Sequence, residues 1–151
     1  MVLPLLTRID HVGIACRDLD QAIGRYRATF GLEVVSLEVN EEQGVREAML
    51  AVGPSAVADV LAGRPGYVQL LEPLAPDTPV GKFLTRRGEG IHHVGYGVSD
   101  IGEALAAIAG TGIRLLDERP RHGSMGASIA FLHPADLGGV LTELVQFARP
   151  A

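Results

Sequence analysis

Apolar and polar positions follow the same pattern in the two halves of the chain. Residues 8–16 and 90–98 are rich in β-branched side chains and alternate with a period of two, which is typical of β-strands. After each of them, apolar side chains recur three and four positions apart, and this spacing predicts an amphipathic helix. These apolar positions are Ala22, Ile23, Tyr26 and Phe30 in the first helix and Ile101, Ala104, Leu105 and Ile108 in the second.

Three further strand-like segments follow each predicted helix. They span about 32–39, 45–52 and 67–72 in the first half and about 113–117, 127–132 and 140–147 in the second. The pattern therefore predicts the order βαβββ twice, which is an α+β fold. A connecting segment with a short helix near residues 80–87 joins the halves.

The two halves are also similar in sequence. Residues 9–18 (IDHVGIACRD) align with residues 91–100 (IHHVGYGVSD), so that His11 matches His93 at an offset of 93 − 11 = 82. Modules of roughly 70–80 residues are small for independent stability. We therefore expect one domain over 1–151, with module one at about 7–73, a linker at about 74–89 and module two at about 90–148. An insertion near residues 55–66 has no counterpart in the second half.

Helix boundaries have recognisable signals in both halves. Asp18 in the first half, and either Ser99 or Asp100 in the second, occupy the position of an N-cap. Gly31 and Gly112 follow the helices where a C-cap glycine is expected.

Strand alternation places His11 and His93 on faces with little bulk. Gly13 shares the face of His11, and Gly95 and Gly97 share the face of His93. A lone strand histidine is more often structural than a ligand, but these two occupy matched positions of a repeat. The small neighbours leave space beside each imidazole, as a ligand site requires. His92 points to the opposite face and is interpreted as structural.

Three more polar side chains share strand faces with apolar neighbours. They are Glu47, Gln69 and Glu143. A carboxylate on an inward face is unfavourable unless it is paired or bound to a metal. Two histidines, one glutamine and one glutamate from equivalent strands would offer two nitrogen and two oxygen ligands to a divalent cation. For Glu47 the alternative is a half-exposed strand position.

Composition and charge exclude several classes of protein. Hydrophobic residues make up 47% and charged residues 21% of the 151 positions, which predicts a packed core. Thirteen Lys and Arg against eighteen Asp and Glu give a net charge of −5, which argues against nucleic acid as a partner. The single cysteine, Cys16, requires no oxidising compartment, and no leader or membrane-spanning stretch is evident. We expect a cytoplasmic protein without a membrane partner.

The repeat and its polar positions resemble the vicinal oxygen chelate superfamily, which has a glyoxalase-like fold. Within it the chain is similar to the methylmalonyl-CoA epimerase family over almost its whole length. The similarity is carried by residues 9–15 (IDHVGIA), 40–50 (NEEQGVREAML), 69–73 (QLLEP), 90–94 (GIHHV), 123–126 (GSMG), 131–134 (FLHP) and 138–144 (GGVLTEL). The resemblance implies tandem βαβββ modules that form a cupped mixed sheet.

The resemblance also implies a reaction and a site. The reaction would be metal-dependent epimerisation at C2 of methylmalonyl-CoA, between the (2R) and (2S) forms. The implied metal ligands are His11, Gln69, His93 and Glu143. The implied acid/base pair is Glu47 and Glu143. The metal would be a divalent ion, Co²⁺ first, with Zn²⁺, Mn²⁺ or Ni²⁺ as alternatives, and the protein would be a homodimer that binds a small-molecule CoA thioester.

The chemistry of the reaction agrees with these residue types. Inversion at C2 needs removal of a weakly acidic C–H proton, stabilisation of the enolate, and return of a proton to the opposite face. Two inward carboxylates supply the acid and the base, although a base that is also a metal ligand has reduced basicity. The turn of Ser124, Met125 and Gly126 could offer backbone N–H groups to the substrate carboxylate.

Other functions of the same fold stay open on the sequence alone. One is a lactoylglutathione lyase-like glyoxalase, and another is an Fe(II) dioxygenase, against which Gln69 counts because the facial triad has no fourth protein ligand. A third is a metal-free resistance-type protein that binds small molecules. Stoichiometric divalent metal in the purified protein would separate the enzymes from this third class.

Overall fold

The computed structural model describes residues 5–53 and 65–147, so most of the insertion predicted near residues 55–66 lies outside the described residues. The chain divides into two compact units. The central unit is His11–His92, and the terminal unit is Met1–Asp10 together with His93–Ala151. Two strands, β1 (Leu6–Ala15) and β5 (Gly90–Val98), contribute residues to both units.

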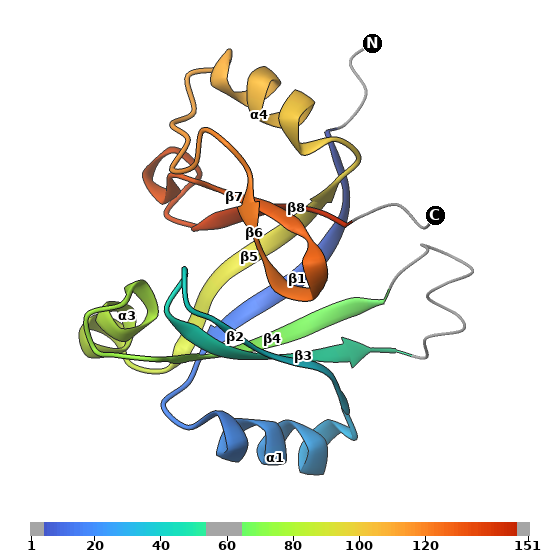
Figure 1. Cartoon of the computed structure of the whole chain (residues 1–151), viewed down its shortest axis with the longest axis vertical. Coiled ribbons are helices and arrows are strands. Elements are labelled where there is room, and N and C mark those ends of the chain that lie inside the picture. The colour runs from blue at the N-terminus through green and yellow to red at the C-terminus, as the bar shows by residue number, and fades with distance from the viewer. Residues whose placement is uncertain (1–4, 54–64, 148–151) are drawn as a thin grey trace. The chain divides into compact units, whose positions relative to one another are not determined.

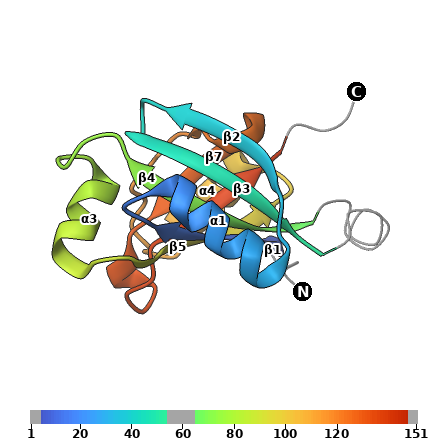
Figure 2. The same cartoon turned by 90° about the horizontal axis from the view of Figure 1, so that it is seen from below.

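Among its described residues, the central unit contains strands β1, β2, β3 and β4 and helices α1 and α3 (Figure 1). The strand order is β2-β3-β4-β1, with β1 parallel to β4 and the other pairs antiparallel. Helix α1 crosses one face of β3 and β4, as Figure 2 shows. The bounds are α1 Leu19–Phe30, β2 Val34–Asn40, β3 Val45–Val52, β4 Gly66–Pro73 and α3 Pro79–Arg87.

The apolar stripe of α1 forms the core that the sequence pattern predicts. Leu19 and Ile23 pack against Leu50 of β3 and Leu70 of β4, and Cys16 joins the same cluster. Burial raises the pKa of the Cys16 thiol to about 12, so this side chain behaves as a small apolar core residue.

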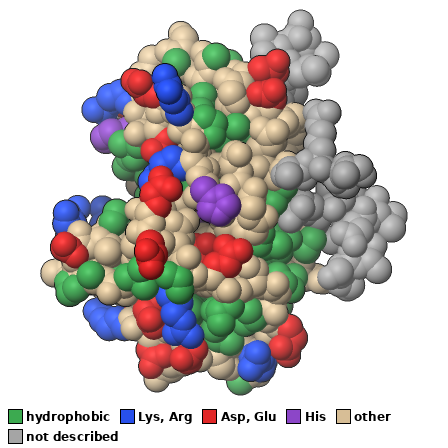
Figure 3. All heavy atoms as spheres, viewed as in Figure 1, with side chains coloured by type: hydrophobic (Ala, Val, Ile, Leu, Met, Phe, Trp, Pro, Cys, Tyr) green, Lys and Arg blue, Asp and Glu red, His purple; other side chains and the backbone are tan. Residues whose placement is uncertain are grey.

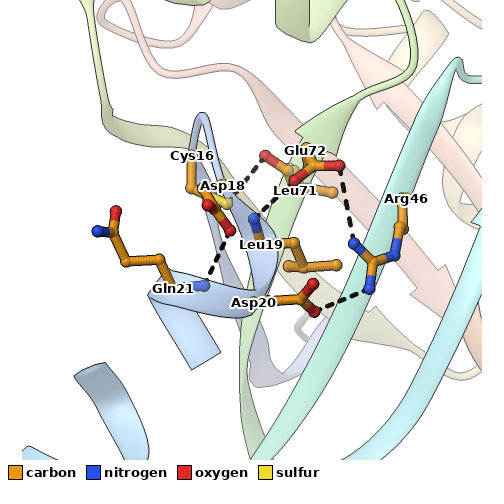
Figure 4. Close-up of polar contacts among 8 residues, drawn as sticks. All are labelled: Cys16, Asp18, Leu19, Asp20, Gln21, Arg46, Leu71 and Glu72. Carbon is orange, nitrogen blue, oxygen red and sulfur yellow. Dashed lines mark hydrogen bonds and ion pairs between the residues drawn. The ribbon is translucent and has the colours of Figure 1, made fainter. Parts of the chain in front are cut away.

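The start of α1 is fixed by three carboxylates (Figure 4). Asp18 caps the helix and accepts a hydrogen bond from the backbone N–H of Gln21 at 3.0 Å. Glu72 of β4 accepts from the N–H of Leu19 at 2.7 Å. Arg46 of β3 pairs with Asp20 at 2.9 Å and with Glu72 at 3.8 Å. These contacts tie α1 to β3 and β4.

The terminal unit repeats this plan. Its strand order is β5-β8-β7-β6, with β5 parallel to β8 and the other pairs antiparallel. Ala104 and Leu105 of α4 pack against Val98, Leu132 and Leu144, as the helical spacing predicts. The bounds are α4 Ile101–Ala109, β6 Arg121–His122, β7 Ser128–Leu132 and β8 Thr142–Gln146.

The order β1-α1-β2-β3-β4 followed by β5-α4-β6-β7-β8 confirms the predicted βαβββ repeat and the α+β class. The predicted linker helix is also present, as α3. Asp100, not Ser99, caps α4 by accepting from the N–H of Glu103 at 2.9 Å. No helix of the described residues is long and apolar enough to cross a membrane.

Two local predictions are wrong. Residues 113–117 form no strand, and β6 stands at Arg121–His122. The segment forms only an isolated antiparallel bridge, between Leu115 and Leu132 of β7. Carboxylates bond to backbone N–H groups on either side of it: Asp136 accepts from Arg114 and Asp117 accepts from Phe131, both at 2.9 Å. The C-cap of α4 is Gly110 in a right-handed conformation, while Gly112, at φ 88°, lies two residues beyond it.

Candidate functional site

Glu47 and Gln69 lie side by side on neighbouring strands of the central unit. In the β3–β4 ladder Met49 is opposite Gln69, so Glu47 and Gln69 are diagonal neighbours on one face. The Gln69 amide donates a hydrogen bond from Nε2 to Glu47 Oε2 at 2.9 Å. Both side chains are buried, at 2% and 5% exposure. The carboxylate is thus held by a neutral donor, and the Gln69 carbonyl oxygen is the amide atom suited to a cation.

His11 belongs to the same face of the central unit. Gly13 is the register partner of Gln69 in the parallel β1–β4 pair, and His11 precedes Gly13 by two positions. Its side chain is 3% exposed. The central unit therefore places a buried imidazole, a buried amide and a buried carboxylate on one sheet face.

His93 and Glu143 have the equivalent arrangement in the terminal unit. Gly95 is the register partner of Glu143 in the parallel β5–β8 pair, and His93 precedes Gly95 by two positions. Each unit thus places its histidine two residues before a glycine that pairs with the Gln or Glu of the neighbouring parallel strand. The similarity of the halves extends from the sequence to the register of the strands.

The spacing of His93 and Glu143 suits a shared cation. His93 Nε2 lies 3.5 Å from Glu143 Oε2, and both side chains are buried. Two ligand atoms bound to one divalent cation at about 2.0–2.2 Å are separated by roughly 2.8–3.6 Å. Both residues are of the types that hold metal ions, so the donor set fits a divalent metal.

Phe131 and Arg121 were missed by the sequence reasoning. Phe131 of β7 is the register partner of Glu143, and its ring makes an edge contact with the His93 ring at 5.5 Å between centroids. The Arg121 guanidinium lies 5.9 Å from the Phe131 centroid and pairs with Asp117 at 2.9 Å. Strand alternation could have indicated Phe131, but Arg121 stands in a two-residue strand with no sequence signal.

His92 contacts a different element. Its ring packs edge-on against Phe83 of α3, with centroids 5.1 Å apart. Burial lowers the pKa of His92 to about 4, so the imidazole is neutral at pH 7. This environment agrees with a structural role.

The turn at Ser124–Gly126 has a constrained backbone. Met125 has φ 57° and ψ 32°, and it is the one residue other than glycine with positive φ among residues 5–53 and 65–147. A left-handed conformation costs a residue with a Cβ roughly 1–2 kcal/mol. A Cβ on Gly123 would lie 2.5 Å from Ile129 Cγ2, which fixes the turn closely against β7. The turn is partly exposed, and the N–H of Ala127 donates to the Ser124 carbonyl at 3.1 Å.

The space expected beside Gly97 is filled by protein. A Cβ at this position would lie 2.7 Å from Arg8 Cγ. Arg8 in turn extends to the buried carboxylate of Asp10, with 3.9 Å between Nε and Oδ1. The prediction that Gly97 makes room for a ligand is wrong, because the missing side chain accommodates Arg8.

The repeat and its buried polar face define a class of proteins. The chain belongs to the glyoxalase/bleomycin resistance protein/dioxygenase superfamily, whose profile matches residues 10–131. It is 33% identical over 144 residues to the ethylmalonyl-CoA/methylmalonyl-CoA epimerase of Cereibacter sphaeroides, covering 94% of this chain and 99% of that one.

Solved structures give closer similarities. A methylmalonyl-CoA epimerase in complex with methylmalonyl-CoA and NH4+ is 54% identical, with a TM-score of 0.89 over 95% of this chain and 96% of that one. A variant of the Streptomyces coelicolor methylmalonyl-CoA epimerase, in complex with 2-nitronate-propionyl-CoA, is 53% identical, with a TM-score of 0.88 over 95% and 99% of the two chains.

Proposed function

We propose that the protein interconverts the (2R) and (2S) epimers of methylmalonyl-CoA by removing and returning the C2 proton. One observation carries the proposal. Each unit places a buried histidine and a buried Gln or Glu at equivalent register positions, in a chain similar to epimerases of this substrate over nearly its full length.

The metal ligands in this proposal are His11, Gln69, His93 and Glu143. All four are buried, and their two nitrogen and two oxygen donors suit a first-row divalent cation. Co²⁺ is our first choice, with Zn²⁺, Mn²⁺ and Ni²⁺ as alternatives. When bound, the cation would act as a Lewis acid on the thioester oxygen of the substrate.

Glu47 is the proposed base. Its carboxylate takes the C2 proton, and the electron pair of the broken C–H bond passes into the enolate of the thioester. The hydrogen bond from Gln69 orients the carboxylate for this transfer. Glu143, in addition to its role as a ligand, is proposed to enter the step protonated and to give that proton to the opposite face of C2. Between turnovers Glu47 releases its proton to solvent and Glu143 regains one.

Variants of a relative support two residues of this proposal, Gln69 and Ser124. The Streptomyces coelicolor epimerase was solved with replacements of a glutamate, a glutamine and a serine. The replaced glutamine and serine are 55 positions apart, as are Gln69 and Ser124 (124 − 69 = 55). We assign the turn of Ser124, Met125 and Gly126 to the substrate carboxylate, because the turn is partly exposed and glycine-containing turns can bind anions.

Two further parts of the proposal concern the setting of the protein. We assign a homodimer, supported by the apolar side chains that β1 and β5 expose, among them Ile9 at 65% and Ile91 at 63%. A monomeric mass in sedimentation would contradict it. We assign the protein to the cytoplasm, and recovery of the tagged protein outside the cytoplasmic fraction would contradict that assignment.

The role of Glu47 is tested by Glu47→Gln. We expect the rate of epimerisation to fall by about 10²-fold or more, because an amide cannot take the proton. Metal content should be unchanged, since Glu47 is outside the proposed ligand set. The measurement is conversion of the (2S) epimer by chiral chromatography, together with metal analysis.

Glu103→Gln is the control for this variant, because Glu103 lies exposed on α4. It should match the wild type in rate and metal content. A Glu47→Gln protein that keeps the wild-type rate would contradict the assignment of the base, and one that loses its metal would show Glu47 to be a ligand.

A further inference from the structure

Helix α3 carries three exposed cations close together. Lys82, Arg86 and Arg87 are exposed and make no ion pair with any residue in 5–53 or 65–147. Figure 3 shows Lys and Arg side chains at the left edge of the molecule, over the position of α3. In a chain with a net charge of −5, such a local excess of positive charge is a candidate for binding an anion.

A hollow lies beside two of these cations. Its volume is about 520 Å³, and its lining residues are Pro76, Asp77, Lys82, Thr85 and Arg86. Lys82 and Arg86 are four positions apart on the helix, so their side chains extend from the same face. Asp77 contributes one negative charge to the same hollow, which leaves the cations in excess.

The wall of this hollow is closely packed. A Cβ on Gly81 would lie 2.5 Å from the carbonyl oxygen of Ala75 and 2.6 Å from that of Pro76, so segment 75–76 rests directly on α3. Thr78 caps the helix by accepting from the N–H of Gly81 at 3.1 Å, and it donates to the Ala75 carbonyl at 2.8 Å. These contacts hold the segment that contributes Pro76 to the hollow against α3.

We infer that the cationic face of α3, formed by Lys82, Arg86 and Arg87, binds the phosphate groups of the coenzyme A part of the substrate. This inference rests on the proposed function, because it assumes a CoA thioester. Coenzyme A carries a pyrophosphate and a further ribose phosphate beyond its pantetheine arm. Guanidinium and ammonium groups bind such phosphates through charge-assisted hydrogen bonds.

The position of α3 in the central unit agrees with the length of the substrate. Val80 and Leu84 pack against Leu71, which is opposite Glu47 in the β3–β4 ladder and two residues after Gln69. Two strand positions cover about 7 Å, and a helix is about 10–12 Å across. The pantetheine arm has the length of about four extended residues, roughly 14 Å. The offset along the strand and the width of the helix are thus each shorter than this arm.

The alternative explanation is a solvated helix end. Arg86 and Arg87 lie in the last turn of α3, where cations interact favourably with the helix dipole. Lys82 lies in the first half of the helix and gains nothing from that effect. If these cations had a purely structural role, replacing them would affect substrates with and without phosphates equally. The test therefore compares the two kinds of substrate.

The test compares methylmalonyl-CoA with methylmalonyl-pantetheine, which lacks the phosphates. In the double variant Lys82→Glu, Arg86→Glu we expect KM for the CoA thioester to rise about 10- to 100-fold. KM for the pantetheine thioester and kcat for both substrates should stay at their wild-type values. The control is Arg25→Glu, which reverses an exposed cation on α1 and should change neither KM.

Equal changes with both substrates, or no change with either, would overturn the inference. If the wild type epimerises neither thioester, the proposed function is wrong. The inference about phosphate binding is then tested separately, by measuring the binding of free coenzyme A and of pantetheine by calorimetry. Tight binding of coenzyme A that the double variant weakens would support it. Binding that the double variant leaves unchanged, or no binding by the wild type, would overturn it.

Discussion

Glu47 and Glu143 are both buried carboxylates, but their neighbours differ. Glu47 accepts a hydrogen bond from the Gln69 amide at 2.9 Å, whereas Glu143 lies 3.5 Å from the Nε2 atom of His93. A carboxylate held by a neutral donor is suited to proton exchange. A carboxylate beside an imidazole nitrogen is suited to share a cation with it. We therefore expect substitutions at these two places to affect rate and metal content differently.

His93 and His92 form a natural comparison, because they are adjacent in the chain and point to different faces. His93→Ala removes a proposed ligand and should weaken metal affinity by about 100-fold or more. This loss is larger than the typical effect of removing a residue that only hydrogen-bonds to a ligand. His92→Ala removes the ring contact with Phe83 and should cost about 1 kcal/mol of stability while metal content stays the same.

Metal content by mass spectrometry after dialysis, and thermal unfolding, check this pair of variants. A His92→Ala protein without metal, or a His93→Ala protein with full metal content, would contradict the assignment of faces.

At the scale of elements, the ends of α1 and α4 show how the halves differ. Gly31 ends α1 at φ 70°, whereas Gly110 ends α4 at φ −70°. Gly31→Ala should lower the free energy of unfolding by about 1 kcal/mol, because the left-handed conformation is unfavourable with a Cβ. Gly110→Ala should be neutral or slightly stabilising, since its conformation is right-handed.

Denaturant unfolding of both glycine variants measures this difference. Equal destabilisation by the two substitutions would show that the conformations of these caps do not control the stability of the helix ends.

The elements with strong periodicity were predictable, and the irregular ones were not. The period of two in β1 and β5 and the helical spacing in α1 and α4 each have a local cause in the sequence, namely burial of one face. Residues 113–117 instead form a single bridge to β7, and the carboxylates of Asp136 and Asp117 bond to the backbone N–H groups of Arg114 and Phe131 beside it. Such long-range side-chain contacts leave no pattern in the segment that they shape.

For the whole molecule, the repeat explains why the sequence indicated the four proposed ligands but not the residues around them. His11 and His93, with Gln69 and Glu143, recur at matched positions, so the symmetry of the sequence indicated them. Arg121 has no counterpart in the first half, and its contact with Phe131 depends on the fold. The room predicted beside Gly97 was assigned to a ligand because the sequence does not reveal that Arg8 fills it.

Removal and return of the C2 proton of methylmalonyl-CoA is the step that every proposed residue role serves. Proton NMR of methylmalonyl-CoA in D2O, with the metal-loaded protein added, measures that step directly. We expect the C2 proton signal to disappear within the time of a few turnovers while the thioester stays intact, and Glu47→Gln to slow its loss by about 10²-fold or more. A C2 proton signal that persists as long as in the sample without protein would show that the chain is not an epimerase of this substrate.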